Sequence, residues 1–326
     1  RRPVPPPTPF GDIDVSSTPA PTGQKAVKRP GDRVFSGLSV GSGILILVTL
    51  AAVAGFLLLQ AKPALEADPS EVRAGQGLIH YVGPLIFGTL LSSIIALVIA
   101  LPLSIGIALF ISHYAPRRLA QGLGYLIDLL AAVPSIIFGL WGLTIATRAV
   151  PVFDTINHYL GWIPLFGGTP SATGRTMLLI GIVLAIMILP IMTAVNREVF
   201  LQTPSLHEEA SLALGATRWE MIRQAVIPFG RSGVVSGAML GLGRALGETM
   251  AVAIILSPSA RYSWELLTSA ASGTIAGDIA LNFPESFGVE RSTLFVSGLA
   301  LFAVTLAVNM FARWMISRRS EFSGAN

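Results

Sequence analysis

The sequence of 326 residues contains no cysteine, and only 12% of its residues are charged. The absence of cysteine excludes disulfides, thiolate metal sites and a cysteine nucleophile, and it leaves the redox compartment undetermined. Soluble domains carry about 25% charged residues, so this composition disfavours a soluble enzyme. With 52% hydrophobic residues, arranged in long runs, the chain is expected to be an all-α integral membrane protein that crosses the bilayer several times.

Several chemical motifs are also missing. There is no Walker A sequence, so the chain does not hydrolyse ATP by that route. The G-x-S-x-G pattern at 37–41 lies at the start of an apolar run instead of between a strand and a helix, and is attributed to chance. The four histidines are scattered without metal-ligand spacing. We therefore assign no catalytic residue, metal or cofactor to this chain, and an intramembrane enzyme acting on lipid or peptide is the disfavoured alternative of a different class.

Six windows with almost no charge are long enough to cross a bilayer, which needs ~20 apolar residues. The second contains Pro84 and Pro102, which predicts a long, tilted or interrupted helix. The third is entered through Asp128, and the fifth contains Arg244 and Glu248. The expected spans are residues 34–61, 74–116, 129–147, 176–196, 232–257 and 292–312.

The 22 Lys and Arg residues are distributed unequally between the two sides of these spans. The two ends of the chain, the 113–120 turn and the 197–231 loop carry 15, whereas the opposite connections carry 6. Because positive charge favours the cytoplasmic side, both termini are expected in the cytoplasm. This orientation explains the net charge of +4 without nucleic acid, and the bases do not alternate with aromatics as in a single-strand binding groove.

The remaining segments are tails. Residues 1–33 hold eight of the 22 prolines and several bases. Such a composition cannot bury a core, and it predicts a disordered cytoplasmic tail. Residues 34–320 are expected to form one six-span domain, followed by a short C-terminal tail at 321–326.

The 197–231 loop predicts two short helices. Ser205 and Glu208 have capping-box spacing, and Thr217 and Glu220 repeat it. Gly215 lies between these two starts and predicts a bend. Two interpretations stay open from these residues alone: an amphipathic helix on the membrane surface, or a docking element for a cytoplasmic partner.

The same loop carries a longer pattern. Pro228 is predicted to end the second helix. Together with Glu209-Ala210-Ser211 and Gly215, it resembles the EAA loop of bacterial ABC importer permeases, although Ser211 replaces an alanine of that pattern. In that family the loop forms the coupling helix that lies in a cleft of the ATPase subunit. The resemblance implies ATPase docking for Glu208, Glu209, Ala210, Gly215, Ala216 and Pro228.

Glycines repeat through the fifth window. Gly233, Gly237 and Gly241 share one smooth helix face, where another helix can approach closely. Gly243 and Gly247 form a second such pair on a neighbouring face.

Arg244 and Glu248 are four residues apart and are expected on one face of this helix. A charge deep in the bilayer is costly unless it is paired or hydrated. One interpretation is a structural pair in which the two charges neutralise each other. The other is a polar pathway, because a guanidinium binds oxyanions in a bidentate fork and keeps its proton.

Two further segments carry a closer resemblance. Residues 243–252 and 132–140 resemble the phosphate-specific permeases of the Pst system, and 31–35 looks more like the PstC type than its paralogue PstA. The resemblance covers roughly residues 32–320. It implies a type I ABC importer permease fold with six transmembrane helices. The implied phosphate path involves Arg244 and Glu248, with Thr249 and Ser135 as further candidates; Ser135 could instead satisfy backbone freed at a broken helix.

The resemblance also implies partners. These are a second permease of the PstA type, a dimer of cytoplasmic PstB-type ATPases that hold ATP and Mg²⁺, and an external PstS-type phosphate-binding protein. The location would be the bacterial cell membrane, in contact with lipid. The nearer alternative is a permease for another oxyanion such as sulfate or molybdate. Phosphate carries donor hydrogens that sulfate lacks, so a carboxylate acceptor such as Glu248 favours phosphate modestly.

Overall fold

The computed structural model describes residues 30–320 except 74, 76, 258, 270 and 271. Residues 1–29 of the expected tail and the segment 321–326 lie outside the described residues. The described residues from Val53 onward form the compact unit discussed below, and residues 30–52 are described only as part of α1. The described residues form helices and connecting loops and contain no strand. The elements are α1 (Pro30–Glu66), α2 (Leu78–Leu109), η2 (Phe110–Tyr114), α3 (Arg117–Ala131), α4 (Ser135–Leu160), α5 (Met177–Leu201), α6 (Ser205–Ala213), α7 (Arg218–Met221), η3 (Ile222–Val226), α8 (Ile227–Leu246), α9 (Met250–Ile255), α10 (Ile275–Asn282), η4 (Phe283–Glu285) and α11 (Gly288–Ser320).

Six helices in this part of the chain are long and apolar enough to span a membrane, which confirms the expected number. They are Val34–Glu66, Leu78–Tyr114, Ser135–Leu160, Met177–Leu201, Arg218–Leu246 and Gly288–Trp314. The second runs on through Pro84 and Pro102 without a break. It ends in a π-helical turn, η2, at Phe110–Tyr114. The protein is therefore a multi-pass membrane protein.

The third span was placed wrongly by the sequence. It begins at Ser135 instead of residue 129, and α4 continues to Leu160. Asp128 lies exposed on α3, a separate amphipathic helix, and does not lead into the span. The reason is Pro134, which is extended and separates the two helices, since proline lacks the N–H that a continuing helix needs. The leucines of α3 had made its end look like the start of a span.

The fifth span also differs from the expected single helix over 232–257. The chain is helical from Arg218 through η3 into α8, and this helix ends at Leu246 with Gly247 as its cap. A short helix, α9, then follows at Met250–Ile255. Pro228 does not end a helix as predicted. It is the second residue of α8, directly after the π-helical turn η3, and the helical run continues through it.

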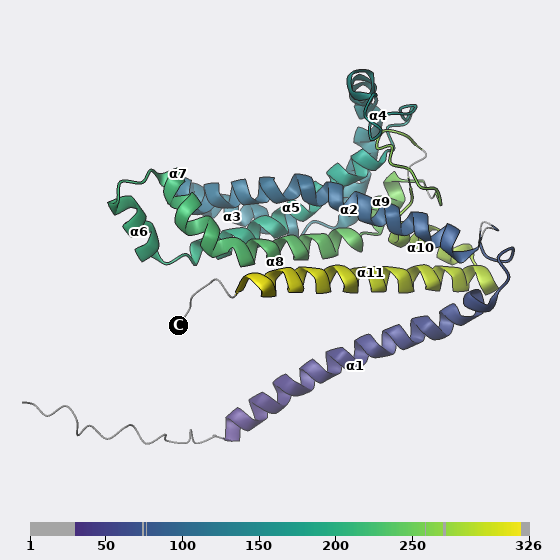
Figure 1. Ribbon diagram of the computed structural model, residues 1–326, viewed down its shortest axis with the longest axis horizontal. Helices are drawn as coiled ribbons and strands as arrows, with labels where there is room; N and C mark the ends of the chain where they lie inside the picture. Colours follow the sequence, from purple (N-terminus) through teal and green to yellow (C-terminus); the bar gives the residue numbers. More distant parts are fainter. Residues whose placement is uncertain (1–29, 74, 76, 258, 270–271, 321–326) are drawn as a thin grey trace, which may run out of the picture. The chain divides into compact units, whose positions relative to one another are not determined.

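Helices α2, α5 and α8 pack side by side (Figure 1). The glycine face of α8 meets α5, as predicted. A Cβ at Gly237 would lie 3.0 Å from Asn196 Oδ1, and one at Gly241 would lie 2.7 Å from Met192 Sδ. Gly243 behaves differently from the prediction: apart from its chain neighbours and the backbone of its own helix, no heavy atom of the described residues lies within 4 Å of the Cβ position there. Its face is open instead of packed.

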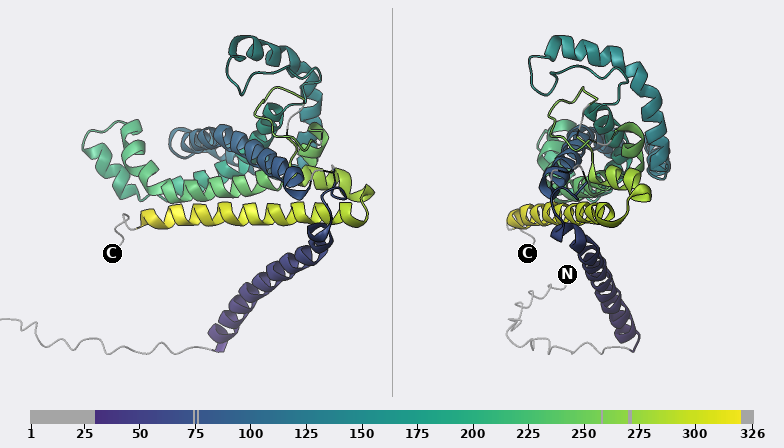
Figure 2. Two further views of the ribbon diagram at one scale, coloured as in Figure 1. Left: turned by 45° about the vertical axis from the view of Figure 1, so that its right-hand side comes forward. Right: turned by 90° about the vertical axis from the view of Figure 1, so that its right-hand side faces the viewer.

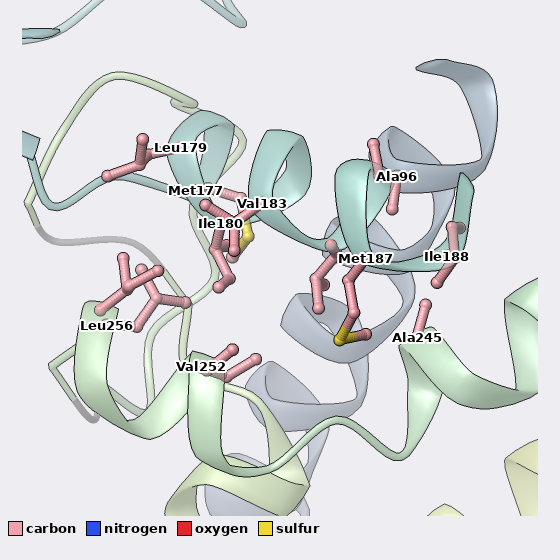
Figure 3. Packing of buried hydrophobic residues seen from close by; sticks show 14 of the residues in the cluster. Ala96, Met177, Leu179, Ile180, Val183, Met187, Ile188, Ala245, Val252 and Leu256 are labelled. Atoms are coloured by element: carbon pink, nitrogen blue, oxygen red, sulfur yellow. The ribbon is translucent and has the colours of Figure 1, made fainter. Parts of the chain in front are cut away.

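The largest apolar core gathers residues of α5 with residues of α2, α8 and α9 (Figure 3). Met187, Ile188 and Ile180 on α5 are almost completely buried in it. Helices α6 and α7 lie at one end of α8, and α9 and α10 lie toward the other end (Figures 1 and 2). The core therefore holds together the helices that run between the predicted docking loop and the segment that follows Arg244.

Candidate transport site and docking region

Gly247, Glu248 and Thr249 form a break between α8 and α9. The Glu248 side chain is buried, and its Oε1 accepts a hydrogen bond from the backbone N–H of Ala251 at 3.1 Å. Glu248 therefore caps the first turn of α9, where a carboxylate satisfies a backbone donor that has no helical partner. The Thr249 hydroxyl donates to Gly247 O at 3.1 Å. The polar side chains of this segment therefore stabilise the break between α8 and α9 by bonding to its backbone.

Arg244 does not pair with Glu248, contrary to the structural interpretation. Because α8 ends at Leu246, the two residues are not on one helix. Arg244 is half-buried, and its guanidinium makes no ion pair or hydrogen bond within the described residues. It also adjoins the open face at Gly243. The observation favours a charge held ready for a ligand over a neutralised pair.

Helix α9 is held from its other end and from one side. The Arg175 guanidinium donates to Ile254 O at 3.2 Å, near the C-terminus of α9, where a cation complements the helix dipole. Gly139 on α4 approaches α9 so closely that a Cβ there would lie 2.9 Å from Ala251 Cα. Ser135 precedes Gly139 by one turn and so lies on the same face of α4. The structure thus places Ser135 on the face that meets α9, and Ser135 makes no hydrogen bond to Arg244 within the described residues.

A polar cluster beyond α9 escaped the sequence argument. Asp278 on α10 is buried, and Tyr81 Oη donates to its Oδ2 at 2.6 Å. Asn282 Nδ2 donates to Asp278 Oδ1 at 2.8 Å, and Arg73 Nη2 donates to Asn282 Oδ1 at 2.6 Å. Burial raises the pKa of Asp278, and these donors and the Arg73 charge oppose the rise. Tyr81 and Arg73 lie 197 and 209 residues from their partners Asp278 and Asn282, so no local spacing signalled the cluster.

The 197–231 loop contains the two predicted helices with the predicted bend. Gly215 has φ +87°, a left-handed conformation that favours glycine. Thr217 and Glu220 form the expected capping box at the start of α7. The first expected box is wrong: Pro204 is the cap residue of α6, and Ser205 makes no capping bond. Pro204 fixes the extended entry to α6, so Ser205 is the first helical residue instead of the cap, and its side chain is exposed.

The two helices of this loop enclose a hollow. A cavity of ≈ 600 Å³ opens between α6, α7 and the start of α8. Ala210, Gly215, Ala216 and Glu220 line it, and Glu209 is exposed on α6. The apolar side chains around it are also open to the outside, with Leu206 73% and Leu214 90% exposed. So much exposed apolar surface at one end of the bundle is suited to contact with another protein.

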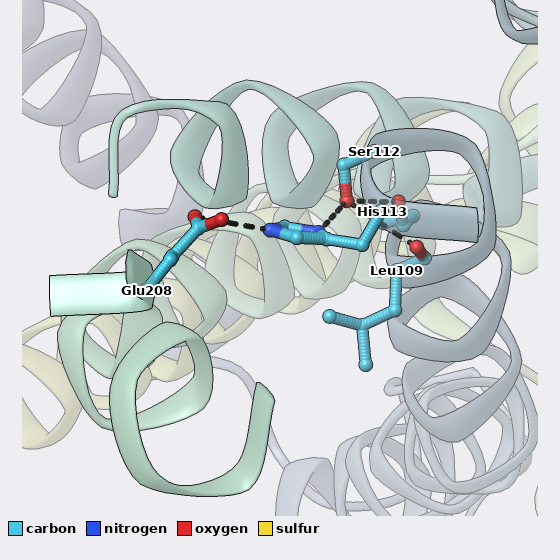
Figure 4. Close-up of polar contacts among 5 residues, drawn as sticks. Leu109, Ser112, His113 and Glu208 are labelled. Carbon is cyan, nitrogen blue, oxygen red and sulfur yellow. Dashed lines mark hydrogen bonds and ion pairs between the residues drawn. The ribbon is translucent and has the colours of Figure 1, made fainter. Parts of the chain in front are cut away.

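Glu208 was grouped with these docking residues, but its carboxylate points toward α2. Figure 4 shows Glu208 Oε1 facing the ring of His113, 3.3 Å from its Nε2. The other ring nitrogen, Nδ1, is 2.6 Å from Ser112 Oγ. His113 itself was missed, because its partner lies 95 residues away in the chain.

Comparison with known proteins identifies the family. Residues 100–321 match the family of binding-protein-dependent transport system inner membrane components. The chain belongs to this family. Among curated relatives, PstC 2 of Mycobacterium bovis, named a phosphate transport system permease protein, is 46% identical over 298 residues, which cover 87% of this chain and 91% of the relative. PstC of Mycobacterium leprae is 44% identical, with 92% and 97% covered. Within the family the chain is therefore of the PstC type.

Solved structures agree on the fold. A bacterial ABC transporter involved in the import of the acidic polysaccharide alginate matches with a TM-score of 0.57 at 17% identity, covering 89% of this chain and 96% of that chain. The alginate transporter in complex with a pentasaccharide-bound periplasmic protein matches at 0.58 and 18%, covering 91% and 100%. At such identities the likeness concerns the fold alone, and it confirms the expected ABC importer permease fold.

Proposed function

We propose that this chain is a permease subunit of an ATP-driven importer of inorganic phosphate. Its family and its named relatives support this function. The structural observation that carries it is Arg244, a half-buried guanidinium in a membrane span that has no counter-charge in the described chain. A bare cation in the bilayer is costly, and an oxyanion in its bidentate fork removes that cost.

The hydrogen bonding of Glu248 explains why this carboxylate does not neutralise Arg244. Glu248 Oε1 is occupied by the N–H of Ala251, so this carboxylate is fixed on α9. Its Oε2 accepts no hydrogen bond within the described residues. It is free to accept a hydrogen of phosphate, which sulfate at neutral pH does not offer. In this proposal Arg244 attracts the anion, Glu248 selects for its proton, and Thr249 and Ser135 lie on the adjoining segments.

The partners belong to the same proposal. The exposed residues of α6 and the cavity beside it, with Glu209, Ala210, Gly215 and Ala216, would dock one subunit of a cytoplasmic ATPase dimer that holds ATP and Mg²⁺. Pro228 would set the start of α8 behind that surface. A second permease would complete the path, and an external binding protein would deliver phosphate. Both termini would be cytoplasmic in the bacterial cell membrane, in keeping with the distribution of Lys and Arg.

The test is phosphate uptake into vesicles that contain the reconstituted complex. Arg244→Gln removes the charge and is expected to abolish uptake while the complex stays assembled. Arg148→Gln, at an exposed arginine of α4, is the matched control and should transport normally. Normal uptake by Arg244→Gln would show that this arginine is outside the path. Uptake of sulfate in place of phosphate by the wild type would keep the architecture and overturn the substrate.

A further inference from the structure

The contact between Glu208 and His113 joins the docking helix α6 to the inner end of α2. Both side chains are largely withdrawn from solvent, with exposures of 9% for His113 and 25% for Glu208. Ser112 Oγ donates to Ala108 O at 2.8 Å and lies 2.6 Å from His113 Nδ1, so the ring is oriented from behind. The contact in Figure 4 is therefore a partly buried contact between oriented side chains, unlike a contact between two mobile surface side chains.

The surroundings of this contact make α2 responsive to α6. Leu109 of α2 packs with Phe200, Met221 and Ile222 in a separate apolar cluster beside it. Two π-helical turns adjoin this cluster, η2 at Phe110–Tyr114 directly after Leu109 and η3 at Ile222–Val226. Such turns interrupt the regular helix ladder and are frequent at functional sites. Helix α2 leads directly into η2, so a displacement of Glu208 would move the end of a long helix.

The outer end of the same helix holds a second buried contact. Helix α2 with η2 runs over Leu78–Tyr114, 37 residues, or ~55 Å at 1.5 Å per residue. Tyr81 binds Asp278 on α10, and Thr89 Oγ1 accepts the N–H of Ile275 at 3.0 Å. Helix α10 in turn lies against α9, since a Cβ at Gly277 would be 3.2 Å from Val252 Cγ1. One continuous helix thus connects the docking region with the segment that follows Arg244.

We propose that His113 is a positioning residue through which α6 moves α2, and that α2 carries this movement to α10 at the outer side. Its role is distinct from ATPase docking: exposed residues of α6 meet the partner, whereas Glu208 faces inward and transmits the movement. Helix α8, continuous with η3, provides the other route from the loop into the membrane. The inference rests on the proposed function, because it assumes that an ATPase displaces α6.

The experiment measures phosphate imported per ATP hydrolysed in vesicles that contain the full complex, with assembly checked by purification of the complex. His113→Ala is expected to assemble and to hydrolyse ATP while phosphate per ATP falls about threefold to tenfold, in the range of single-residue effects on coupling. His113→Gln keeps an N–H donor toward Glu208 and should restore most of the ratio. His80→Ala, at an exposed histidine of the same helix, should leave the ratio unchanged.

The route along α2 has its own test. Tyr81→Phe removes the hydrogen bond to Asp278 and should also lower phosphate per ATP. If both residues act on one route, the double variant of His113→Ala and Tyr81→Phe will be no worse than the more affected single variant. Multiplied losses would overturn the route along α2. An unchanged ratio in His113→Ala would overturn the role of His113, while normal wild-type uptake would leave the proposed function standing.

A structural readout covers variants that assemble poorly. The chain has no cysteine, so pairs of spin labels can be placed at Leu206→Cys on α6 and Phe110→Cys on η2 without removing native thiols. The distance distribution is expected to stay narrow on ATP binding in the wild-type background and to broaden with His113→Ala. A distribution that His113→Ala leaves unchanged would show that this residue does not hold α6 to α2.

Discussion

Gly233 on α8 lies directly against Val199 on α5, so closely that a Cβ at position 233 would overlap the Val199 side chain. This approach is possible only without a side chain. It explains why α8 can pack along α5 in a membrane, where association depends on close contact and not on a hydrophobic driving force.

Gly233→Ala is therefore expected to destabilise the helix pair by about 1–3 kcal/mol, the usual cost of forcing an atom into a packed contact. Gly243→Ala is the matched control on the same helix, because the space beside it is open within this chain. Thermal unfolding of the purified subunit in detergent should show a lower Tm for the first variant and an equal or higher Tm for the second. Equal losses would contradict the assignment of the packed face.

The capping residues of the docking loop give a second prediction. Thr217→Ala removes the acceptor for the N–H of Glu220 and the hydroxyl that binds its carboxylate. Loss of such a cap costs about 1 kcal/mol, so hydrogen exchange in α7 should become faster. Ser205→Ala, which has the same spacing to a glutamate but makes no capping bond, should leave exchange in α6 unchanged. Faster exchange in α6 alone would reverse the assignment.

The sequence predicted some features of the fold and not others. Apolar runs and charge asymmetry were enough for six spans, because length and composition decide membrane insertion. The bend at Gly215 and the glycine face of α8 followed from local conformational rules. The break after Leu246 did not, because the apolar run continues through it. Helix periodicity therefore placed Arg244 and Glu248 together, when the backbone turns between them.

Contacts distant in sequence were equally inaccessible. Nothing near Glu208 indicated that its carboxylate would meet His113 and not a partner protein. The same holds for Tyr81 and Asp278, each unremarkable within its own segment. Only the packing of α2 against elements from the second half of the chain brings these pairs together.

The buried carboxyl of Asp278 predicts a dependence of stability on pH. Its pKa in the folded protein is raised above the ordinary value of 3.8 because burial disfavours the charged form. At pH values between the ordinary pKa and the pKa in the folded protein, the folded state binds more protons than the unfolded state, so stability falls as pH rises. The contribution is fully present below the ordinary pKa and is lost as pH rises through the folded pKa.

Asp278→Asn should remove this part of the slope in a series of Tm measurements taken from acid to neutral pH. Asp154→Asn, at an exposed aspartate of α4, should keep the wild-type slope. If the Asp278→Asn series runs parallel to the wild type, the carboxyl is not the group responsible.

Glu209 gives the prediction that separates docking from transmission. Its side chain is exposed on α6 and makes no hydrogen bond or ion pair within the described residues, whereas the neighbouring Glu208 faces His113. Glu209→Lys reverses a charge at the proposed contact surface and should weaken co-purification of the ATPase subunit at least tenfold, since like charges brought together at an interface cost several kcal/mol. Glu208→Gln keeps the shape of its side chain behind that surface, so the ATPase should still co-purify while phosphate imported per ATP falls. Loss of the ATPase from Glu208→Gln and its retention by Glu209→Lys would exchange the two roles.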